Sequence, residues 1–370
     1  MNRKIYFITG GGTGGHIYPA IAVADGLLKE ETTEKVYYVG NPNNLEASIT
    51  KEKEYEFLPV LSSGMPRKIT FCFIKWFIEM MQALVKSVGY IRKYKPDVIF
   101  GTGGYVSAPV ILGGVLCGVP IIMHDCDANP GLVTRGLAPL AKSISIAFEA
   151  AKIQLKNKNC YVNGNQIRAK FKTLSKEDAQ KSFSFTSEKL TLCVMGGSQG
   201  AKSINNATVS ILEKLVNEYN IQVIFQTGKK NYDDIKAKLD EKFPNWSENK
   251  NLVVKPYFED MVSVLKSSDI AVSRAGSLSI SELCASSVAP IFVPYPYAAA
   301  DHQRKNAKCM EKNGAGLYIE DSQLNEQTLL NMITDLLNNR EKLKTIQDNA
   351  QKLAVYDATS KIIEQIKKVV

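Results

Sequence analysis

A glycine-rich stretch near the N-terminus constrains the fold of this chain more than any other feature. Residues 5–9 form a short apolar run, residues 10–15 contain five glycines and one threonine, and Pro19 lies in a following segment with helical apolar spacing. The pattern predicts a strand, a tight loop and a helix. Glycines allow close approach of the backbone to a ligand, and a helix start directs N–H groups at an anion. We therefore expect phosphate or pyrophosphate here; a turn without a ligand is the alternative.

Two well-known nucleotide loops do not fit this stretch. Gly10, Gly12 and Gly15 have the spacing of the dinucleotide fingerprint, but no acidic residue follows the second expected strand, 36–40, to hold a ribose. A P-loop requires Lys and then Ser or Thr after its last glycine, and His16 occupies that position. Another kind of phosphate ligand is therefore favoured.

Composition indicates the number of domains and the class of partner. With 370 residues, 45% hydrophobic and 22% charged, the chain is long enough for two domains with separate cores. The formal net charge of +9 favours anionic partners, whereas the absence of RNA-recognition and zinc-site patterns argues against nucleic acid. Seven cysteines without a CxxC pair are typical of reduced thiols, and the N-terminus lacks the pattern of a signal peptide, so we expect an intracellular protein.

Strand and helix patterns alternate along most of the chain. A second glycine loop, 196–201, opens a series similar to the first. Such alternation predicts parallel sheets covered by helices on both faces, with ligands at the carboxyl ends of the strands. We expect an α/β protein of two Rossmann-like domains that face each other across a cleft. The domains are predicted at 1–164 and 165–344, and a helix over about 345–370 is expected to pack back on the first.

The most apolar stretch, residues 69–91, predicts a packed helix. Polar residues that include Lys75 and Glu79 recur at helical spacing and make a membrane span costly. At its leading end, aromatic residues such as Trp76 lie beside basic residues such as Arg67. This combination is used by peripheral proteins at anionic membranes. The alternative is that the aromatic residues belong to the core and the basic residues form its solvated rim.

Candidate catalytic and metal-binding residues follow the expected strands. All three histidines, His16, His124 and His302, lie in loops just after strands, and a structural role is the alternative for each. His16 stands out because it shares the phosphate loop. Asp125 and Asp127 form the DxD pattern of metal-dependent sugar-nucleotide enzymes. Glycine loops and helix starts bind phosphate without a cation, so we expect no metal.

Two helix starts in the second half carry polar residues suited to a nucleotide sugar. After the expected strand 269–273, small residues and hydroxyls suit phosphate, and Glu282 suits a sugar diol. The alternative is that Ser277 caps the helix and Glu282 pairs with a neighbouring cation. Residues 301–307 open another helix, with Gln303 in its first turn.

Six ordered motifs resemble those of the MurG family of glycosyltransferases. They are GGTGGH (11–16), GGYVS (103–107), GNxxR (164–168), GGSQGA (196–201), RAGSLSISE (274–282) and DHQxxNA (301–307). The resemblance spans nearly the whole chain and implies a two-domain GT-B fold. It implies transfer of N-acetylglucosamine from UDP-GlcNAc to the 4-hydroxyl of the muramyl sugar in undecaprenyl-pyrophosphoryl-MurNAc-pentapeptide (lipid I), which gives lipid II. It also implies inversion at the anomeric carbon without a metal or other cofactor.

The resemblance also implies the location, partners and site residues. The protein is expected to be peripheral at the cytoplasmic face of the cell membrane, in contact with anionic lipid and with other proteins of cell-wall synthesis. Thr13, Gly14 and Gly15 should approach the donor or acceptor pyrophosphate. The other expected substrate-binding residues are Tyr105, Arg168, Ser198, Phe258, Ser277, Leu278, Ser279, Ile280, Ser281, Glu282 and Gln303. Phe258 would lie against the uracil, Glu282 would hold the ribose, and N–H groups near Leu278 would bind the phosphates.

One motif departs from the family pattern. The family has His-Glu-Gln-Asn where this chain has His124-Asp125-Cys126-Asp127, so Asp127 or Asn129 is expected to take over the contact of the missing asparagine. We expect a one-step inverting displacement with His16 as the base and Asp125 as the second candidate. Loop N–H groups and Arg168 would stabilise the charge on the departing UDP.

Two other functions remain open from the sequence. A UDP-GlcNAc 2-epimerase with the same fold would convert UDP-GlcNAc alone, whereas a lipid-dependent transferase would not. A silent nucleotide-binding scaffold of the cell-wall machinery would bind UDP-GlcNAc and never release UDP.

Overall fold

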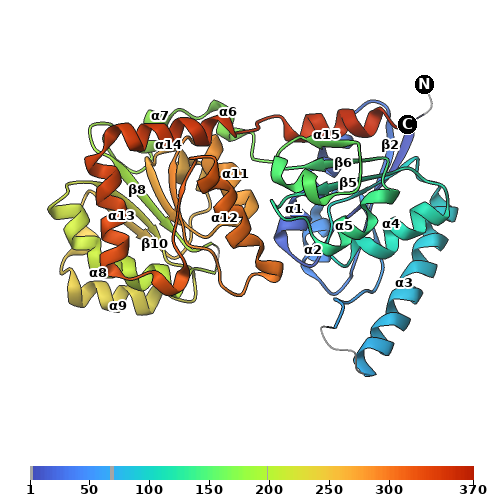
Figure 1. Ribbon diagram of the computed structural model, residues 1–370, viewed down its shortest axis with the longest axis horizontal. Coiled ribbons are helices and arrows are strands. Elements are labelled where there is room, and N and C mark those ends of the chain that lie inside the picture. The colour runs from blue at the N-terminus through green and yellow to red at the C-terminus, as the bar shows by residue number, and fades with distance from the viewer. Residues whose placement is uncertain (1–2, 67–70, 198) are drawn as a thin grey trace. The chain divides into compact units, whose positions relative to one another are not determined.

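The chain folds into two α/β units, each built on a parallel sheet (Figure 1). The computed structural model describes residues 3–66, 71–197 and 199–370. The first unit comprises Met1–Gln166 and Asp357–Val370, and the second comprises Ile167–Tyr356. The expected α/β class with two Rossmann-like domains is therefore confirmed.

The first unit contains a seven-stranded parallel sheet in the order β3-β2-β1-β4-β5-β6-β7. Its strands are β1 (Lys4–Thr9), β2 (Thr33–Gly40), β3 (Glu56–Pro59), β4 (Val98–Gly101), β5 (Ile121–Asp125), β6 (Ser143–Ile146) and β7 (Cys160–Val162). Its helices are α1 (Gly14–Leu27), α2 (Leu45–Ile49), α3 (Phe71–Tyr94), α4 (Ser107–Leu116), α5 (Leu132–Leu137) and α15 (Ala358–Lys367). Successive side chains point to opposite faces, so Phe7 joins a core with α3 and α4, and Ile8 joins another with α1 and α15.

The last helix belongs to the first unit, as the sequence predicts. Ile363 of α15 lies so close to Gly26 of α1 that a Cβ at position 26 would be 2.5 Å from its Cδ1. The buried Gln365 amide accepts a hydrogen bond from Asn163 Nδ2 at 2.7 Å and donates one to Ser143 Oγ at 2.7 Å. These contacts tie α15 to the loop after β7 and to β6.

The second unit contains a six-stranded parallel sheet in the order β10-β9-β8-β11-β12-β13. Its strands are β8 (Thr191–Met195), β9 (Gln222–Gln226), β10 (Leu252–Lys255), β11 (Ile270–Ser273), β12 (Ala289–Phe292) and β13 (Leu317–Tyr318). Its helices are α6 (Lys170–Thr173), α7 (Lys176–Lys181), α8 (Lys202–Asn217), α9 (Tyr232–Lys242), α10 (Met261–Lys266), α11 (Ser277–Ala285), α12 (His302–Lys312), α13 (Glu326–Asn338) and α14 (Arg340–Lys352). Its core lies between the sheet and helices that include α8 and α13.

The structure differs from the sequence prediction at three places. The polar segment before residue 60 contains an edge strand, β3, that was not expected. The predicted helix over about 345–370 is divided between α14 and α15, and only α15 joins the first unit, so the chain returns at residue 357 rather than near 345. The segment 165–188, which begins at the predicted domain boundary, contains α6 and α7, which pack against α10.

The N-terminal end of helix α3 extends beyond the rest of its unit in Figure 1, and the helix exposes apolar side chains. Trp76 is half-buried, donates from Nε1 to Ser63 O at 3.0 Å, and packs against Phe73 with ring centroids 5.3 Å apart. Arg67, the basic residue expected beside it, lies outside the described residues. Among the helices described, none is both long and apolar enough to cross a membrane.

Candidate active site

The first candidate site lies where the strand order of the first sheet reverses. The chain proceeds outward from β1 to β2 and β3 on one side, and from β4 to β7 on the other. The loop 10–13 follows β1, and the loop 102–106 follows its neighbour β4. Parallel sheets bind ligands beyond the carboxyl ends of their strands at such a point. The predicted glycine loop near the N-terminus and the GGYVS motif (103–107) therefore meet here.

The two loops touch each other through glycine backbone. Gly104 has φ +76°, and a Cβ there would be 2.2 Å from the carbonyl oxygen of Gly11. A Cβ at Gly12 would be 2.9 Å from the ring of Tyr105, whose hydroxyl accepts a hydrogen bond from Asn44 Nδ2 at 2.9 Å. The glycines are thus needed for the loops to approach each other, and Tyr105 fixes one against the other.

His16 lies in the first turn of α1, beside both loops. Its Nδ1 is 2.9 Å from the carbonyl oxygen of Thr102, and Thr102 Oγ1 donates to the carbonyl oxygen of His16 at 2.6 Å. A carbonyl oxygen only accepts, so Nδ1 carries a proton, and in the neutral ring Nε2 is then the nitrogen with the lone pair. The ring is half-buried, beside Gly103 and Gly104. This tautomer suits a general base. The neighbouring Thr13 is exposed, and Gly14 and Gly15 form the start of the helix.

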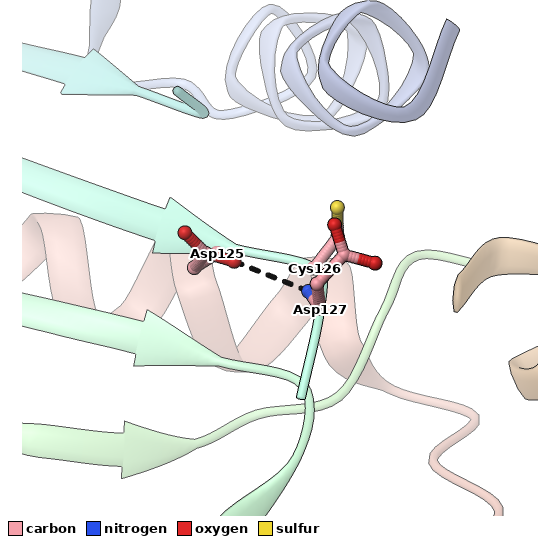
Figure 2. A group of neighbouring side chains, drawn as sticks. All are labelled: Asp125, Cys126 and Asp127. Atoms are coloured by element: carbon pink, nitrogen blue, oxygen red, sulfur yellow. Dashed lines mark hydrogen bonds between the residues drawn. The ribbon is translucent and has the colours of Figure 1, made fainter. Parts of the chain in front are cut away.

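Asp125 ends β5 and turns its carboxylate onto its own loop (Figure 2). Its Oδ1 accepts the N–H of Asp127 at 3.1 Å and its Oδ2 accepts the N–H of Gly131 at 3.0 Å. Burial raises the pKa of the carboxyl, and a hydrogen bond from Thr134 opposes this rise. The side chain is 2% exposed. Asp125 therefore shapes the 125–131 loop.

The Asp125-Cys126-Asp127 group is poorly suited to a metal ion. Its three ligand atoms lie within 4.8 Å of one another (Figure 2). Both oxygens of Asp125 already accept backbone N–H groups, and the central ligand is a thiol, which hard cations such as Mg²⁺ do not prefer. The hydrogen bonds account for this arrangement, and we assign no cation to it.

The preceding residue, His124, has a structural position. It is fully buried, with Nδ1 3.0 Å from Ser145 Oγ and Nε2 3.3 Å from Asn165 Oδ1. Burial lowers its pKa to about 4, so the ring is neutral near pH 7. Asn129, further along the same loop, is also buried. His124 thus ties β5 to β6 and to the chain that leaves the first unit.

The second candidate site lies at the corresponding reversal of the second sheet, between β8 and β11. The glycine loop 196–201 follows β8, and Arg274-Ala275-Gly276 leads from β11 into α11. Gly276 occupies the N-cap position, so Ser277 is the first residue of the helix and not its cap. The first N–H groups of a helix have no acceptor within it. A helix start of this kind, at the carboxyl edge of a sheet, suits an anion. Ser198, in the glycine loop, lies outside the described residues.

Glu282 and Arg168 form an ion pair in this unit. Arg168 Nε and Nη2 lie 3.1 and 2.8 Å from Glu282 Oε1. Burial raises the pKa of Glu282, and the Arg168 charge opposes that rise. Glu282 therefore pairs with a neighbouring cation, as the alternative interpretation of the sequence proposed. That cation is Arg168, which was itself expected to bind the substrate.

The remaining expected residues of α11 divide between surface and core. Leu278, Ser279 and Ser281 are half-buried, and Ser281 Oγ donates to Ser277 O at 3.1 Å. Ile280 is 1% exposed, so it offers a ligand little more than its backbone. Ser277 and Ser279 place small side chains in the first turn of this helix.

Phe258 and Gln303 are held by backbone contacts. Phe258 is 5% exposed, its N–H donates to Gln226 Oε1 at 2.9 Å, and its ring packs against Phe183. Little of the Phe258 ring is therefore exposed for stacking against the uracil of the nucleotide. Gln303 Oε1 accepts the N–H of Tyr295 at 2.9 Å, which leaves its amide NH₂ as the group suited to a ligand.

Residues outside the expected set also shape the first site. Thr102 holds His16, Asn44 holds Tyr105, and Thr134 contacts Asp125. Thr102 directly precedes the GGYVS motif (103–107), so its position in the sequence could have indicated that it belongs to the site. Asn44 and Thr134 lie in no motif, and only the folded chain brings them to the site.

Comparisons with known proteins agree across the whole chain. Residues 6–146 match the glycosyltransferase family 28 N-terminal domain, and residues 191–362 match the glycosyltransferase family 28 C-terminal domain. A UDP-N-acetylglucosamine–N-acetylmuramyl-(pentapeptide) pyrophosphoryl-undecaprenol N-acetylglucosamine transferase from Desulforamulus reducens is 36% identical, over 98% of each chain. The crystal structure of MurG from Acinetobacter baumannii has a TM-score of 0.79 at 26% identity and covers 99% of each chain.

A UDP-GlcNAc 2-epimerase from Neisseria meningitidis, solved with UDP-GlcNAc bound, has a TM-score of 0.68 at 13% identity. It covers 99% of this chain and 100% of that one. This second likeness shows the fold alone.

Proposed function

The chain belongs to glycosyltransferase family 28, among the UDP-N-acetylglucosamine–N-acetylmuramyl-(pentapeptide) pyrophosphoryl-undecaprenol N-acetylglucosamine transferases, and from this membership we infer its reaction. It transfers N-acetylglucosamine from UDP-GlcNAc to the 4-hydroxyl of MurNAc in lipid I and so forms lipid II for peptidoglycan. The observation that carries this conclusion is the 36% identity over 98% of both chains. The epimerase alternative rests on a shared fold at 13% identity and is not favoured.

We propose that UDP-GlcNAc is bound by the second unit. The start of α11 offers N–H groups to the diphosphate, and small residues at 277 and 279 leave room for it. Glu282 would accept hydrogen bonds from the ribose, and Arg168 orients its carboxylate by two N–H contacts. Because the Arg168 guanidinium is shared with Glu282, its help to the departing diphosphate would be partial. The free amide of Gln303 is suited to a sugar hydroxyl or the acetamido group.

We propose His16 as the base that takes the proton of the acceptor hydroxyl. The contact with Thr102 O fixes the tautomer in which Nε2 can accept that proton. As the hydroxyl oxygen bonds to the anomeric carbon, the bond from that carbon to the β-phosphate oxygen breaks, and the electron pair leaves with UDP. Asp125 is the weaker candidate because both its oxygens accept backbone N–H groups and its side chain is buried. The loop that contains Thr13, Gly14 and Gly15 would approach the acceptor pyrophosphate.

We propose that α3 binds the cytoplasmic face of the membrane, where the polyprenyl acceptor resides. Ile74, Phe77, Ile78, Met81 and Val85 are each at least 43% exposed, and their spacing places them on one face of the helix. The last four, with Gln82 and Lys86, line a groove of ≈ 430 Å³. An exposed apolar stripe with lysines near it suits an anionic lipid surface.

The reaction is tested by measuring UDP release with a short-chain lipid I analogue. UDP should appear only when UDP-GlcNAc and the analogue are both present, with lipid II as the second product. Conversion of UDP-GlcNAc in the absence of the analogue would indicate an epimerase. Binding of UDP-GlcNAc without any release of UDP would indicate a scaffold.

The membrane proposal is tested with liposomes that contain anionic lipid. The variant Ile74→Ser/Phe77→Ser/Ile78→Ser should lose sedimentation with liposomes yet keep turnover of a water-soluble acceptor analogue. The matched control Leu116→Ser removes an apolar residue that is 69% exposed outside α3 and should leave sedimentation unchanged. Equal sedimentation of the triple variant and the unmodified protein would contradict the proposal.

A further inference from the structure

Arg274 contacts more segments of the second site than any residue assigned to it above. It lies between β11 and α11 and is 14% exposed. Its Nη1 donates to the carbonyl oxygens of Val293 and Pro294 at 3.0 and 3.1 Å and to the Asp321 carboxylate. Its Nη2 donates to Ser203 Oγ at 3.1 Å. One guanidinium therefore joins four separate stretches of chain.

Three of these stretches lead directly to the proposed UDP-GlcNAc pocket. Ser203 lies in the first turn of α8, immediately after the glycine loop 196–201. Val293 and Pro294 follow β12 and lead to Tyr295, whose N–H holds Gln303. Arg274 itself directly precedes the start of α11. The positions of the glycine loop, the helix start and Gln303 thus depend on a single side chain.

The charge of Arg274 is already compensated within the protein. The Asp321 carboxylate, 21% exposed, accepts from the guanidinium and also from Ser203 Oγ, the latter at 2.6 Å. The other face of the guanidinium lies 5.7 Å from the ring centroid of Tyr295. Both Nη groups are directed at protein acceptors, which argues against direct binding of a phosphate. The arrangement has the geometry of a support for the residues that do bind one.

We propose that Arg274, Asp321 and Ser203 form a positioning cluster for the UDP-GlcNAc pocket, an inference that rests on the function proposed above. Asp321 fixes the orientation of Arg274. Arg274 in turn fixes the start of α8, the segment after β12 and the start of α11. A lysine cannot replace it, because an ammonium is a point charge and lacks the planar fork that reaches acceptors on several sides. Loosening the cluster misplaces the N–H groups and the amide that contact the donor, and such small displacements are costly in binding and rate.

The experiment compares Arg274→Lys, Asp321→Asn and Ser203→Ala with the unmodified enzyme. Each substitution should raise the KM for UDP-GlcNAc, about tenfold or more for the first two, and leave the KM for a lipid I analogue within about twofold. Calorimetry with UDP alone should show a matching loss of affinity. The control Asp335→Asn breaks a surface ion pair with Lys342 in the same unit and should change neither quantity.

Thermal unfolding followed by Trp246 fluorescence reports on the fold of the second unit. Should Arg274→Lys fail to fold, Ser203→Ala and Asp321→Asn carry the test, because they keep the guanidinium. Folded variants with unchanged UDP affinity, or with an equal rise in both KM values, would overturn the inference and leave the proposed function intact. An unmodified protein that neither binds UDP nor releases it would overturn the proposed function itself.

Discussion

His124 should make the first unit sensitive to mild acid. The imidazole is fully buried between Ser145 and Asn165, and burial lowers its pKa from 6.5 to about 4. Well above pH 6.5 the ring is neutral in both the folded and the unfolded chain, so it makes no pH-dependent contribution there. Between pH 6.5 and about 4 the unfolded chain binds a proton that the folded chain does not, so the free energy of unfolding falls as the pH falls.

The size of this effect follows from the two pKa values. The full interval from 6.5 to about 4 corresponds to roughly 3 kcal/mol, and about 2.5 kcal/mol of it should be lost between pH 7.5 and pH 4.5. Asp125 acts in the opposite direction, because burial raises its pKa and the folded state then binds its proton first. The contribution of His124 to the pH dependence is therefore isolated by comparing the protein with a variant that has no titratable group at position 124. The difference between their losses of unfolding free energy is the His124 contribution.

The assay is urea unfolding at the two pH values, with His124→Gln as the variant. The chain has two tryptophans, and Trp246→Phe in every protein leaves Trp76 to report on the first unit. His124→Gln should lose about 2.5 kcal/mol less than its parent between pH 7.5 and pH 4.5. The control His302→Gln lies in the second unit, so it should leave the transition reported by Trp76 unchanged. Equal pH dependence in parent and His124→Gln would refute the reasoning.

Three further substitutions test the loops and the last helix. His16→Ala should lower kcat by about 100-fold or more with little change in the KM for UDP-GlcNAc, and near-normal turnover would exclude it as the base. Gly104→Ala should destabilise the first unit by several kcal/mol more than Gly118→Ala. The two positions have similar backbone angles, φ +76° and +73°, but only at position 104 would a Cβ lie 2.2 Å from a backbone oxygen. Equal unfolding midpoints of the two variants would contradict this. Gln365→Ala should cost about 2–3 kcal/mol, since it leaves two buried polar partners unsatisfied, and Trp76 fluorescence during unfolding would detect the loss.

The fold was largely predictable because its signals are local. Apolar runs of strand length, glycine loops after them and helical spacing between them define the parallel sheets without reference to distant residues. The strand β3 was not predicted because it is short and lies at the sheet edge, where most of its side chains are exposed or only partly buried. The break between α14 and α15 was not predicted because the sequence has neither glycine nor proline there. Tyr356, which donates to Ala285 O at 3.0 Å, holds the chain there through tertiary contact alone.

The site was predictable only in part, and the reason is physical. A glycine motif marks backbone that must approach a ligand or another loop, as at Gly104. The side chains that hold such backbone are set by packing and can come from any element. Tyr38, in no motif, donates to Gly10 O at 2.6 Å, and Asp321, also in no motif, accepts from Arg274 across 47 positions. The first unit thus fixes its loop with neutral hydroxyl and amide groups, and the second with an ion pair. A substitution scan confined to the motifs would therefore find the groups suited to bind substrate and miss many of those that place them.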